Sequence, residues 1–217
     1  MTKKNIASIN IIIADDHGVV REGLRQICSD NKDLILVGQA DNGLDAIKLC
    51  RTAKADVLIL DISLPDRTGI EVLKQVKKEF PDLPVLILSI HREDQYAIRS
   101  LKAGAAGFLN KQSATEELVT AVRQIAGGRK YVSSSLAQEL ANQIGQDHEQ
   151  PAHEMLSDRE YQTLIMIASG KTVSDIAAEL VLSVKTISMY RARILLKMKL
   201  RHNAELTHYA ISHQLTE

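Results

Sequence analysis

The feature that most constrains the fold is a regular alternation between short apolar runs and longer stretches of helical periodicity. The runs are rich in Val, Ile and Leu and almost continuously hydrophobic, which is typical of strands covered on both faces of a parallel sheet. They occupy residues 9–13, 34–37, 57–60, 85–88 and 107–109. Helix-like stretches lie between and after them, at residues 19–28, 44–50, 70–80, 95–102 and 116–125. This alternation predicts a doubly wound α/β domain built on a five-stranded parallel sheet.

The pattern changes after Gly127 and Gly128. Residues 133–153 contain several Ser and Gln and few apolar residues, a composition typical of a linker, with a possible short helix at residues 136–144. From Leu156 onward every periodic segment is helical. The sequence therefore predicts three parts: an α/β domain at residues 1–130, a linker at residues 131–153, and a small all-α domain at residues 154–217.

Composition narrows the possible functions. The chain has 217 residues, and its 27 Lys+Arg balance its 27 Asp+Glu, which argues against a uniformly basic nucleic-acid binder. It contains no apolar run of the ~20 residues that a membrane span needs, and no signal-peptide core follows its N-terminal lysines. Cys28 and Cys50 lie outside any metal-binding or redox motif. We expect a soluble cytoplasmic protein with reduced thiols and no attachment to a membrane.

Polar side chains follow the predicted strands at the points where the strands end. Asp15 and Asp16 follow the first strand and Asp61 the third; Ser89 ends the fourth, and Lys111 follows the fifth shortly after its end. Because the carboxyl ends of parallel strands meet at one edge of a sheet, these groups should lie close together. Three neighbouring carboxylates repel one another unless a cation lies between them, and hard oxygen ligands favour Mg²⁺. The lysine and the serine hydroxyl suit phosphoryl oxygens.

These residues stand in motifs that point to a family. Residues 9–130 resemble the receiver domain of two-component response regulators, which has the flavodoxin/CheY-like fold. The motifs that carry the resemblance are Ala14–His17, Leu60–Asp66 with Gly69, Leu88–Ser89 and Lys102–Lys111.

The resemblance implies a role for each residue of the set. Asp61 would accept a phosphoryl group from a sensor histidine kinase, and Mg²⁺ would be held by Asp15, Asp16, Asp61 and the backbone carbonyl of Ser63. Ser89 and Lys111 would bind phosphoryl oxygens. Phe108 would be the switch aromatic, rotating inward when Ser89 moves toward the phosphoryl group. We further expect the side chains of Ser63 and His91 to tune the lifetime of the phosphoaspartate, and His17 to be a solvated loop residue.

The C-terminal segment carries the signals of a helix-turn-helix domain. Ser157 with Glu160 and Thr172 with Asp175 form capping boxes, and Ser183 is a third N-cap. Helices are predicted to start near Asp158, Val173 and Val184. On the third helix, a spacing of 100° per residue separates a packing face from a free face. The packing face contains Ile187, Tyr190, Ile194 and Met198, and the free face contains Lys185, Ser188, Met189, Ala192 and Arg193.

Charge and motifs extend this interpretation. Between Leu180 and Ala204 there are six basic residues and no acidic one. Residues 154–214 resemble the LuxR-type domain of the NarL/FixJ family, through residues 156–160, 168–172, 175–177 and 182–188. The resemblance implies binding to double-stranded DNA, with a dimer contact on a last helix at residues 204–212. The expected DNA contacts are Lys185, Thr186, Ser188, Met189, Ala192, Arg193 and Lys197.

The sequence thus predicts a DNA-binding transcriptional response regulator that is not an enzyme in its own right. Phosphorylation of Asp61 would shift the receiver, release the helix-turn-helix domain and promote a DNA-binding homodimer. Two alternatives stay open. One is a DNA-binding regulator that does not depend on phosphorylation, and the other is a Mg²⁺-dependent phosphatase with an aspartyl-phosphate intermediate. Such phosphatases typically need a second Asp at the position that Ser63 occupies.

Overall fold

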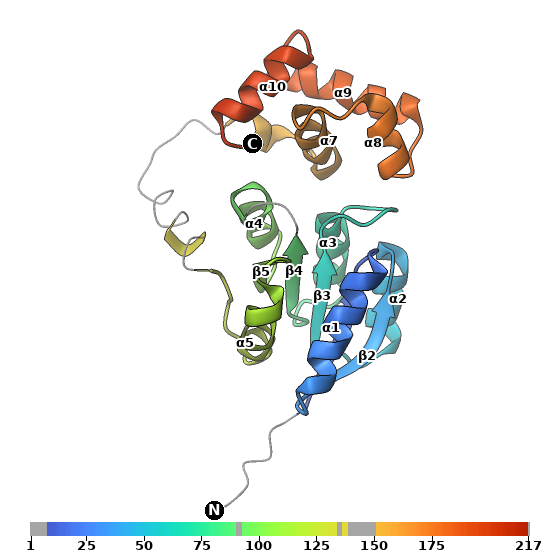
Figure 1. Cartoon of the computed structure of the whole chain (residues 1–217), viewed down its shortest axis with the longest axis vertical. Helices are drawn as coiled ribbons and strands as arrows, with labels where there is room; N and C mark the ends of the chain where they lie inside the picture. Colours follow the sequence, from blue (N-terminus) through green and yellow to red (C-terminus); the bar gives the residue numbers. More distant parts are fainter. Residues whose placement is uncertain (1–7, 90–92, 134–135, 139–150, 217) are drawn as a thin grey trace, which may run out of the picture. The chain divides into compact units, whose positions relative to one another are not determined.

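The computed structural model describes residues 8–89, 93–133, 136–138 and 151–216. Its contacts divide the chain into two compact units, residues 1–143 and residues 144–217 (Figure 1). Most of the short helix predicted at residues 136–144, and the loop residue His91, lie outside the described residues. In the part of the chain that the model describes, no helix has both the length and the apolar character needed to cross a bilayer.

The first unit is built on a five-stranded sheet whose strands are all parallel. Its spatial order is β2-β1-β3-β4-β5. β2 lies on one side of β1, and β3, β4 and β5 lie on the other, so the strand order reverses between β1 and β3. Ligands of doubly wound folds bind outside the carboxyl ends of the strands at such a switch point. The predicted sheet is therefore confirmed. The strands are β1 (Ile9–Ala14), β2 (Leu34–Ala40), β3 (Val57–Asp61), β4 (Val85–Ser89) and β5 (Gly107–Asn110).

Five helices cover the two faces of this sheet (Figure 1). α1 and α5 contact each other on one face, and α2, α3 and α4 are successive neighbours on the other. An apolar cluster between the sheet and the first pair forms one core of the unit, and it includes Ile11, Ile59 and Leu118. Each such side chain contributes about 1.5–3 kcal/mol when it is fully buried. The helices are α1 (Gly18–Asp30), α2 (Gly43–Thr52), α3 (Gly69–Glu79), α4 (Glu93–Lys102) and α5 (Ala114–Ala126).

Two features of this unit bear on the sequence predictions. Cys28 and Cys50 are buried free thiols, and burial raises the pKa of each to about 11, so both stay protonated. Tyr131 lies in the segment predicted as a linker, but its backbone pairs with β5. Its N–H donates to the carbonyl of Ala106 at 2.9 Å.

The second unit contains a short 3₁₀ helix, η1 (Ala152–Met155), followed by four α-helices. The α-helices start where the sequence predicts, and the two capping boxes form, with Ser157 and Thr172 as N-caps. The N-cap oxygen of Ser183 accepts the N–H of Thr186 at 3.0 Å. The helices are α7 (Asp158–Ala168), α8 (Val173–Glu179), α9 (Val184–Met198) and α10 (Asn203–Ser212).

The core of the second unit is aliphatic. Residues of α7 and α8, among them Ile167 and Ile176, pack against Ile187 of α9. Ile194 and Met198 of α9 are buried as well, which confirms the packing face predicted from periodicity. Gly170 ends α7 with a φ of +85°, a conformation that a side chain would strain.

Candidate functional site

The polar residues predicted at the sheet edge form one buried cluster. Asp15 follows β1, Asp61 is the last residue of β3, and Lys111 follows β5. The two carboxylates are each 1% exposed. Lys111 Nζ lies 2.7 Å from Asp15 Oδ2 and 2.8 Å from Asp61 Oδ2, so one ammonium group is shared by two acids. Three strands that are far apart in the sequence thus bring together opposite charges away from water.

The charges in this cluster shift one another's pKa values. Burial is the largest influence on Asp61 and raises its pKa, Lys111 lowers it, and the neighbouring Asp15 raises it again, so the pKa ends above its usual value. Burial alone would lower the pKa of Lys111, but the two carboxylates outweigh burial and raise it. The lysine is therefore charged at neutral pH, while burial makes the ionised form of Asp61 less stable than it would be in water.

The acidic side of the cluster fits a divalent cation. Asp15, Asp16, His17 and Asp61 each offer a ligand atom, and these atoms lie within 4.8 Å of one another. Asp15 Oδ2 is buried and, apart from the ion pair with Lys111, makes no hydrogen bond among the described residues. Carboxylate oxygens are the donors that hard cations such as Mg²⁺ prefer. The pocket is thus compatible with Mg²⁺.

The loop that follows Asp61 turns back on itself next to this pocket. The N–H of Ser63 donates to Asp61 Oδ1 at 3.2 Å, and Ser63 pairs with Thr68 in an antiparallel bridge. The N–H of Gly69 donates to the carbonyl of Ile62 at 2.8 Å. A Cβ on Gly69 would come within 2.2 Å of the Asp61 carbonyl oxygen, so only glycine allows this close approach.

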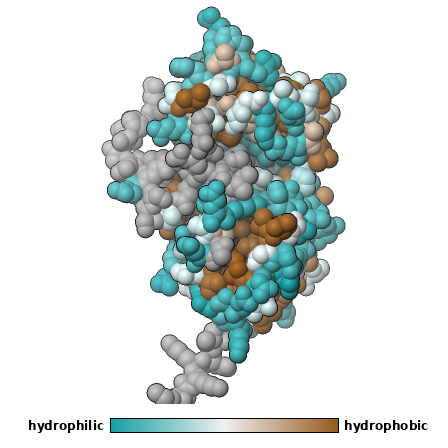
Figure 2. All heavy atoms as spheres, in the orientation of Figure 1, coloured by the Kyte–Doolittle hydropathy of each residue, from teal (hydrophilic) through white to brown (hydrophobic). Residues whose placement is uncertain are grey.

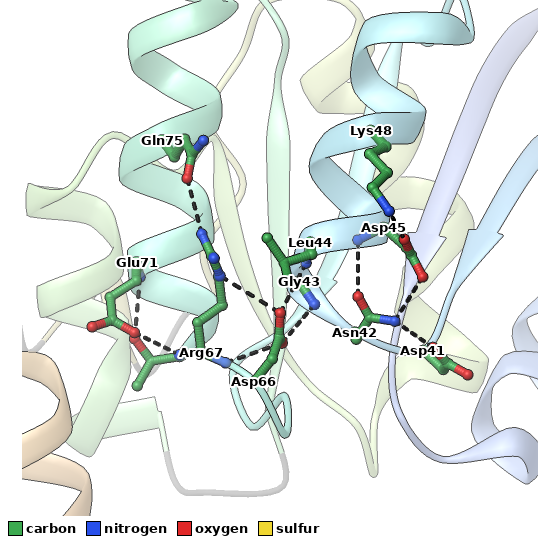
Figure 3. A network of polar contacts seen from close by, with 11 residues as sticks. Asp41, Asn42, Gly43, Leu44, Asp45, Lys48, Asp66, Arg67, Glu71 and Gln75 are labelled. Carbon is green, nitrogen blue, oxygen red and sulfur yellow. Dashed lines mark hydrogen bonds and ion pairs between the residues drawn. The ribbon is translucent and has the colours of Figure 1, made fainter.

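A second set of contacts fixes the same loop to α2 (Figure 3). The Asp66 carboxylate accepts the N–H of Gly43 at 2.8 Å and that of Leu44 at 2.9 Å, at the N-terminus of the helix. The Arg67 side chain lies so close to Gly43 that a Cβ on Gly43 would come within 2.6 Å of Arg67 Cγ. Arg67 Nη1 donates a hydrogen bond to the side-chain oxygen of Gln75 in α3 at 3.0 Å. The loop that carries Ser63 is therefore held from two helices. Asp66 belongs to the motif Leu60–Asp66, but the sequence alone predicted no role for it.

Ser89 is the last residue of β4, and Phe108 lies within the neighbouring strand β5. Both are fully buried, and the carbonyl of Ser89 accepts the N–H of Lys111 at 2.8 Å. That bond ties the end of β4 to the residue that follows β5.

The free face of α9 lies largely in solvent, as periodicity predicts. Thr186 is half-buried, and its hydroxyl lies 2.8 Å from that of Ser183. The surface that Figure 2 shows mixes hydrophilic and hydrophobic areas. The exposed side chains of the predicted DNA-contacting set are Lys185, Ser188, Met189, Ala192, Arg193 and Lys197.

Lys197 differs from the other predicted DNA contacts. Its Nζ lies 2.6 Å from Glu160 Oε2, and the same carboxylate oxygen accepts the N–H of Ser157 at 2.8 Å. The lysine is thus paired with the capping box of α7, although 40% of its side chain is exposed. The sequence did not reveal this pair, because its partners are 37 positions apart.

Comparison with protein families agrees with both units. The family described as "Response regulator receiver domain" matches residues 11–123, and "Bacterial regulatory proteins, luxR family" matches residues 154–210. Response regulator UvrY of Escherichia coli K12 is 38% identical over 208 residues, which is 95% of each chain. Response regulator GacA of Pseudomonas aeruginosa PAO1 is 37% identical over 211 residues, 96% of this chain and 98% of GacA.

Solved structures give the same result. RcsB from Salmonella enterica serovar Typhimurium, bound to promoter rprA in the presence of the phosphomimetic BeF3-, aligns with a TM-score of 0.64. The identity is 27%, over 93% of this chain and 98% of that one. A parallel sheet with an acidic pocket at its carboxyl edge, together with a helix-turn-helix unit, is the architecture of a DNA-binding response regulator. The chain belongs to the two-component response regulators of the NarL/FixJ family, with a receiver domain and a LuxR-type DNA-binding domain.

Proposed function

We propose that Asp61 accepts a phosphoryl group from a sensor histidine kinase. The observation that supports this most directly is the shared ammonium of Lys111, which lies 2.8 Å from Asp61 and is held in place by Asp15. In the transfer, an Asp61 oxygen forms a bond to phosphorus while the bond from phosphorus to the kinase histidine nitrogen breaks. Lys111 and the Ser89 hydroxyl bind the phosphoryl oxygens, which become more negative on Asp61 than the carboxylate was.

The cofactor that fits this pocket is Mg²⁺, which Asp15, Asp16, Asp61 and the backbone carbonyl of Ser63 would hold. When bound, it neutralises part of the negative charge on the carboxylates and the incoming phosphoryl group. The fixed loop after Asp61 supports this assignment, since Gly69 and Asp66 hold Ser63 beside the pocket. Side-chain chemistry at Ser63 and His91 then sets how long the phosphoaspartate lasts.

Phosphorylation draws Ser89 toward the phosphoryl group and lets Phe108 reposition, which releases the helix-turn-helix domain. The released chain forms a homodimer in the cytoplasm and binds double-stranded DNA. The exposed face of α9 supports the DNA-binding role, with Lys185 and Arg193 beside apolar Met189. Solved structures of RcsB include one described as two dimers bound to two parallel DNAs, and we extend that mode of binding to this chain.

The test uses the full-length chain with Mg²⁺ and a small phosphodonor such as acetyl phosphate. We expect Asp61→Asn to abolish phosphate incorporation, while Asp41→Asn, an exposed carboxylate outside the pocket, leaves it unchanged. The sedimentation coefficient and the binding to DNA selected from random duplexes should both increase with the donor in the wild type and in Asp41→Asn, but not in Asp61→Asn. Incorporation without any change in either would contradict the switch and favour a regulator that does not depend on phosphorylation. Turnover of small phosphate esters would instead favour the phosphatase.

A further inference from the structure

His17 is oriented toward the acidic pocket rather than toward its own helix. It is the N-cap residue of α1, yet its ring makes no capping hydrogen bond. Its Nδ1 lies 2.6 Å from Asp16 Oδ1 and 3.4 Å from Asp15 Oδ1. The backbone N–H of His17 donates to Asp15 Oδ1 at 2.8 Å, which fixes the position of the residue. The ring is therefore held beside two carboxylates that face the pocket.

A second histidine of the chain gives an internal comparison. His202 is the N-cap of α10, and its ring Nδ1 accepts the N–H of Glu205 at 3.3 Å, as a capping side chain does. The two histidines occupy equivalent helix positions and have similar side-chain exposure, 57% for His17 and 61% for His202. Helix capping therefore explains the orientation of the His202 ring but not that of the His17 ring.

The spacing around His17 suits a shared cation. Its nitrogen belongs to a group of four ligand atoms, from Asp15, Asp16, His17 and Asp61, that lie within 4.8 Å of one another. Around a cation with ligands at about 2.1 Å, neighbouring ligand atoms lie about 3 Å apart and opposite ones about 4 Å apart. Only small side-chain movements separate the observed spacing from such a shell. The exposure of the ring leaves it free to make them.

We propose that His17 Nδ1 is a ligand of the cation in this pocket and shifts its preference toward divalent first-row transition cations over Mg²⁺. The inference rests on the proposed cation site of Asp15, Asp16 and Asp61. An imidazole nitrogen is a softer donor than an oxygen and adds little to the binding of Mg²⁺, whereas transition cations accept it readily. The chemistry of the donor set, three carboxylates and one imidazole, thus selects Mn²⁺ as a suitable probe.

The experiment is pulsed electron paramagnetic resonance of Mn²⁺ bound to the full-length chain without an affinity tag. We expect the ¹⁴N coupling of a ligating imidazole in the wild type and in His202→Gln, the matched control. In His17→Asn, which keeps a polar atom near the position of Nδ1, the coupling should disappear. Asp16→Asn should weaken the binding of Mn²⁺ itself, which assigns the signal to this pocket. In competition titrations, the ratio of Mn²⁺ to Mg²⁺ affinity should fall roughly tenfold in His17→Asn.

The outcomes separate the inference from the site on which it rests. Bound Mn²⁺ without nitrogen coupling in the wild type overturns the role of His17 and leaves the carboxylate site intact. Nitrogen coupling that persists in His17→Asn also overturns it. A wild-type chain that binds neither Mn²⁺ nor Mg²⁺ overturns both the inference and the proposed cation site.

Discussion

Each unit of the molecule pairs a carboxylate with a lysine at nearly the same distance, yet the two pairs differ in character. Asp61 and Lys111 are 2.8 Å apart in the sheet unit, and Glu160 and Lys197 are 2.6 Å apart in the helical unit. The pKa of Asp61 lies above its usual value. That of Glu160 lies below: burial alone would raise it, but Lys197 and the Ser157 hydrogen bonds together lower it.

The difference comes from what else each carboxylate meets. Both carboxylates accept a backbone N–H as well as the lysine, but burial is the largest influence on the pKa of Asp61, and the lysine of Glu160 reaches into solvent. Asp61 shares its lysine with a second buried acid, Asp15, so its negative charge is only partly compensated. A lysine at hydrogen-bond distance therefore does not by itself fully compensate the negative charge of a buried carboxylate. An under-compensated carboxylate is one that gains from a cation, which is what the proposed phosphoacceptor site requires.

The largest effect that tests this comparison is expected for Lys111→Met. The substitution leaves Asp15 and Asp61 facing each other without a countercharge, at a cost of about 3–5 kcal/mol in the free energy of unfolding. Addition of Mg²⁺ should recover part of the loss, and so should a fall in pH that protonates one acid. Chemical denaturation of the full-length chain, followed by hydrogen exchange of the sheet amides, measures the change.

The matched control is Lys48→Met. Lys48 also lies 2.8 Å from an aspartate, Asp45, but 68% of its side chain is exposed. Its loss should leave the unfolding midpoint close to that of the wild type. Equal effects of the two substitutions would show that burial and the second acid do not distinguish the Lys111 pair.

The next largest effect is expected for Glu160→Ala in the helical unit. The substitution removes the hydrogen bond that Glu160 accepts from the Ser157 N–H and the ion pair of Glu160 with Lys197. We expect a loss of about 2 kcal/mol, measured by hydrogen exchange of amides in α7 and α9. Glu160→Gln should recover part of it, because the amide oxygen can still accept the Ser157 N–H. A smaller loss for Ala than for Gln would contradict the capping role.

The two carboxylates should also respond oppositely when neutralised. The pKa of Asp61 is raised in the folded state, so ionisation of Asp61 destabilises the fold. This loss of stability grows as pH rises from 3.8 through the folded pKa and then stays constant. Asp61→Asn should thus stabilise the chain by about 1 kcal/mol at neutral pH without Mg²⁺. The folded pKa of Glu160 is lowered, so its stabilisation is present above 4.5 and is lost as pH falls through the folded pKa. Glu160→Gln should destabilise at neutral pH only.

Unfolding titrations of both variants and the wild type from pH 3 to pH 8 measure this difference. The difference between each variant and the wild type should shrink toward the acidic end, as the two carboxylates take up protons. A destabilised Asp61→Asn at neutral pH would mean that Lys111 fully compensates Asp61, and the contrast between the pairs would be lost.

The sequence predicted the framework of both units for a physical reason. Strand and helix periods depend on neighbours in the chain, so the apolar runs and the capping residues Ser157 and Thr172 already locate the elements. The pocket followed, because parallel strands place the residues after them at one edge. The proximity of Asp15, Asp61 and Lys111 could therefore be predicted from the sequence, and the structure places Lys111 within ion-pair distance of both acids.

Contacts between distant parts of the chain could not be predicted in this way. Asp66 caps α2 from 23 positions away, and no local pattern distinguishes it from a solvated turn residue. The pair of Lys197 with Glu160 is equally invisible to periodicity, which placed the lysine only near a basic surface. The ring of His17 follows an acidic pair in the sequence, but no local pattern shows that it turns toward Asp16 instead of capping α1. Such side-chain orientations are decided by tertiary packing.

The smallest expected effect concerns strain in the helical unit, which is stored in the backbone rather than in charge. Val181, in the turn between α8 and α9, has a φ of +53° and is 74% exposed. A β-branched residue in this left-handed region is strained by about 1–2 kcal/mol. Val181→Asn should therefore stabilise the unit by about 0.5 kcal/mol, because Asn tolerates the conformation. Hydrogen exchange of α9 amides measures it, and Val184→Asn, at an exposed helical position nearby, is the control. A gain in the control as large as that at Val181 would mean that removing exposed apolar surface, and not relieving strain, is the cause.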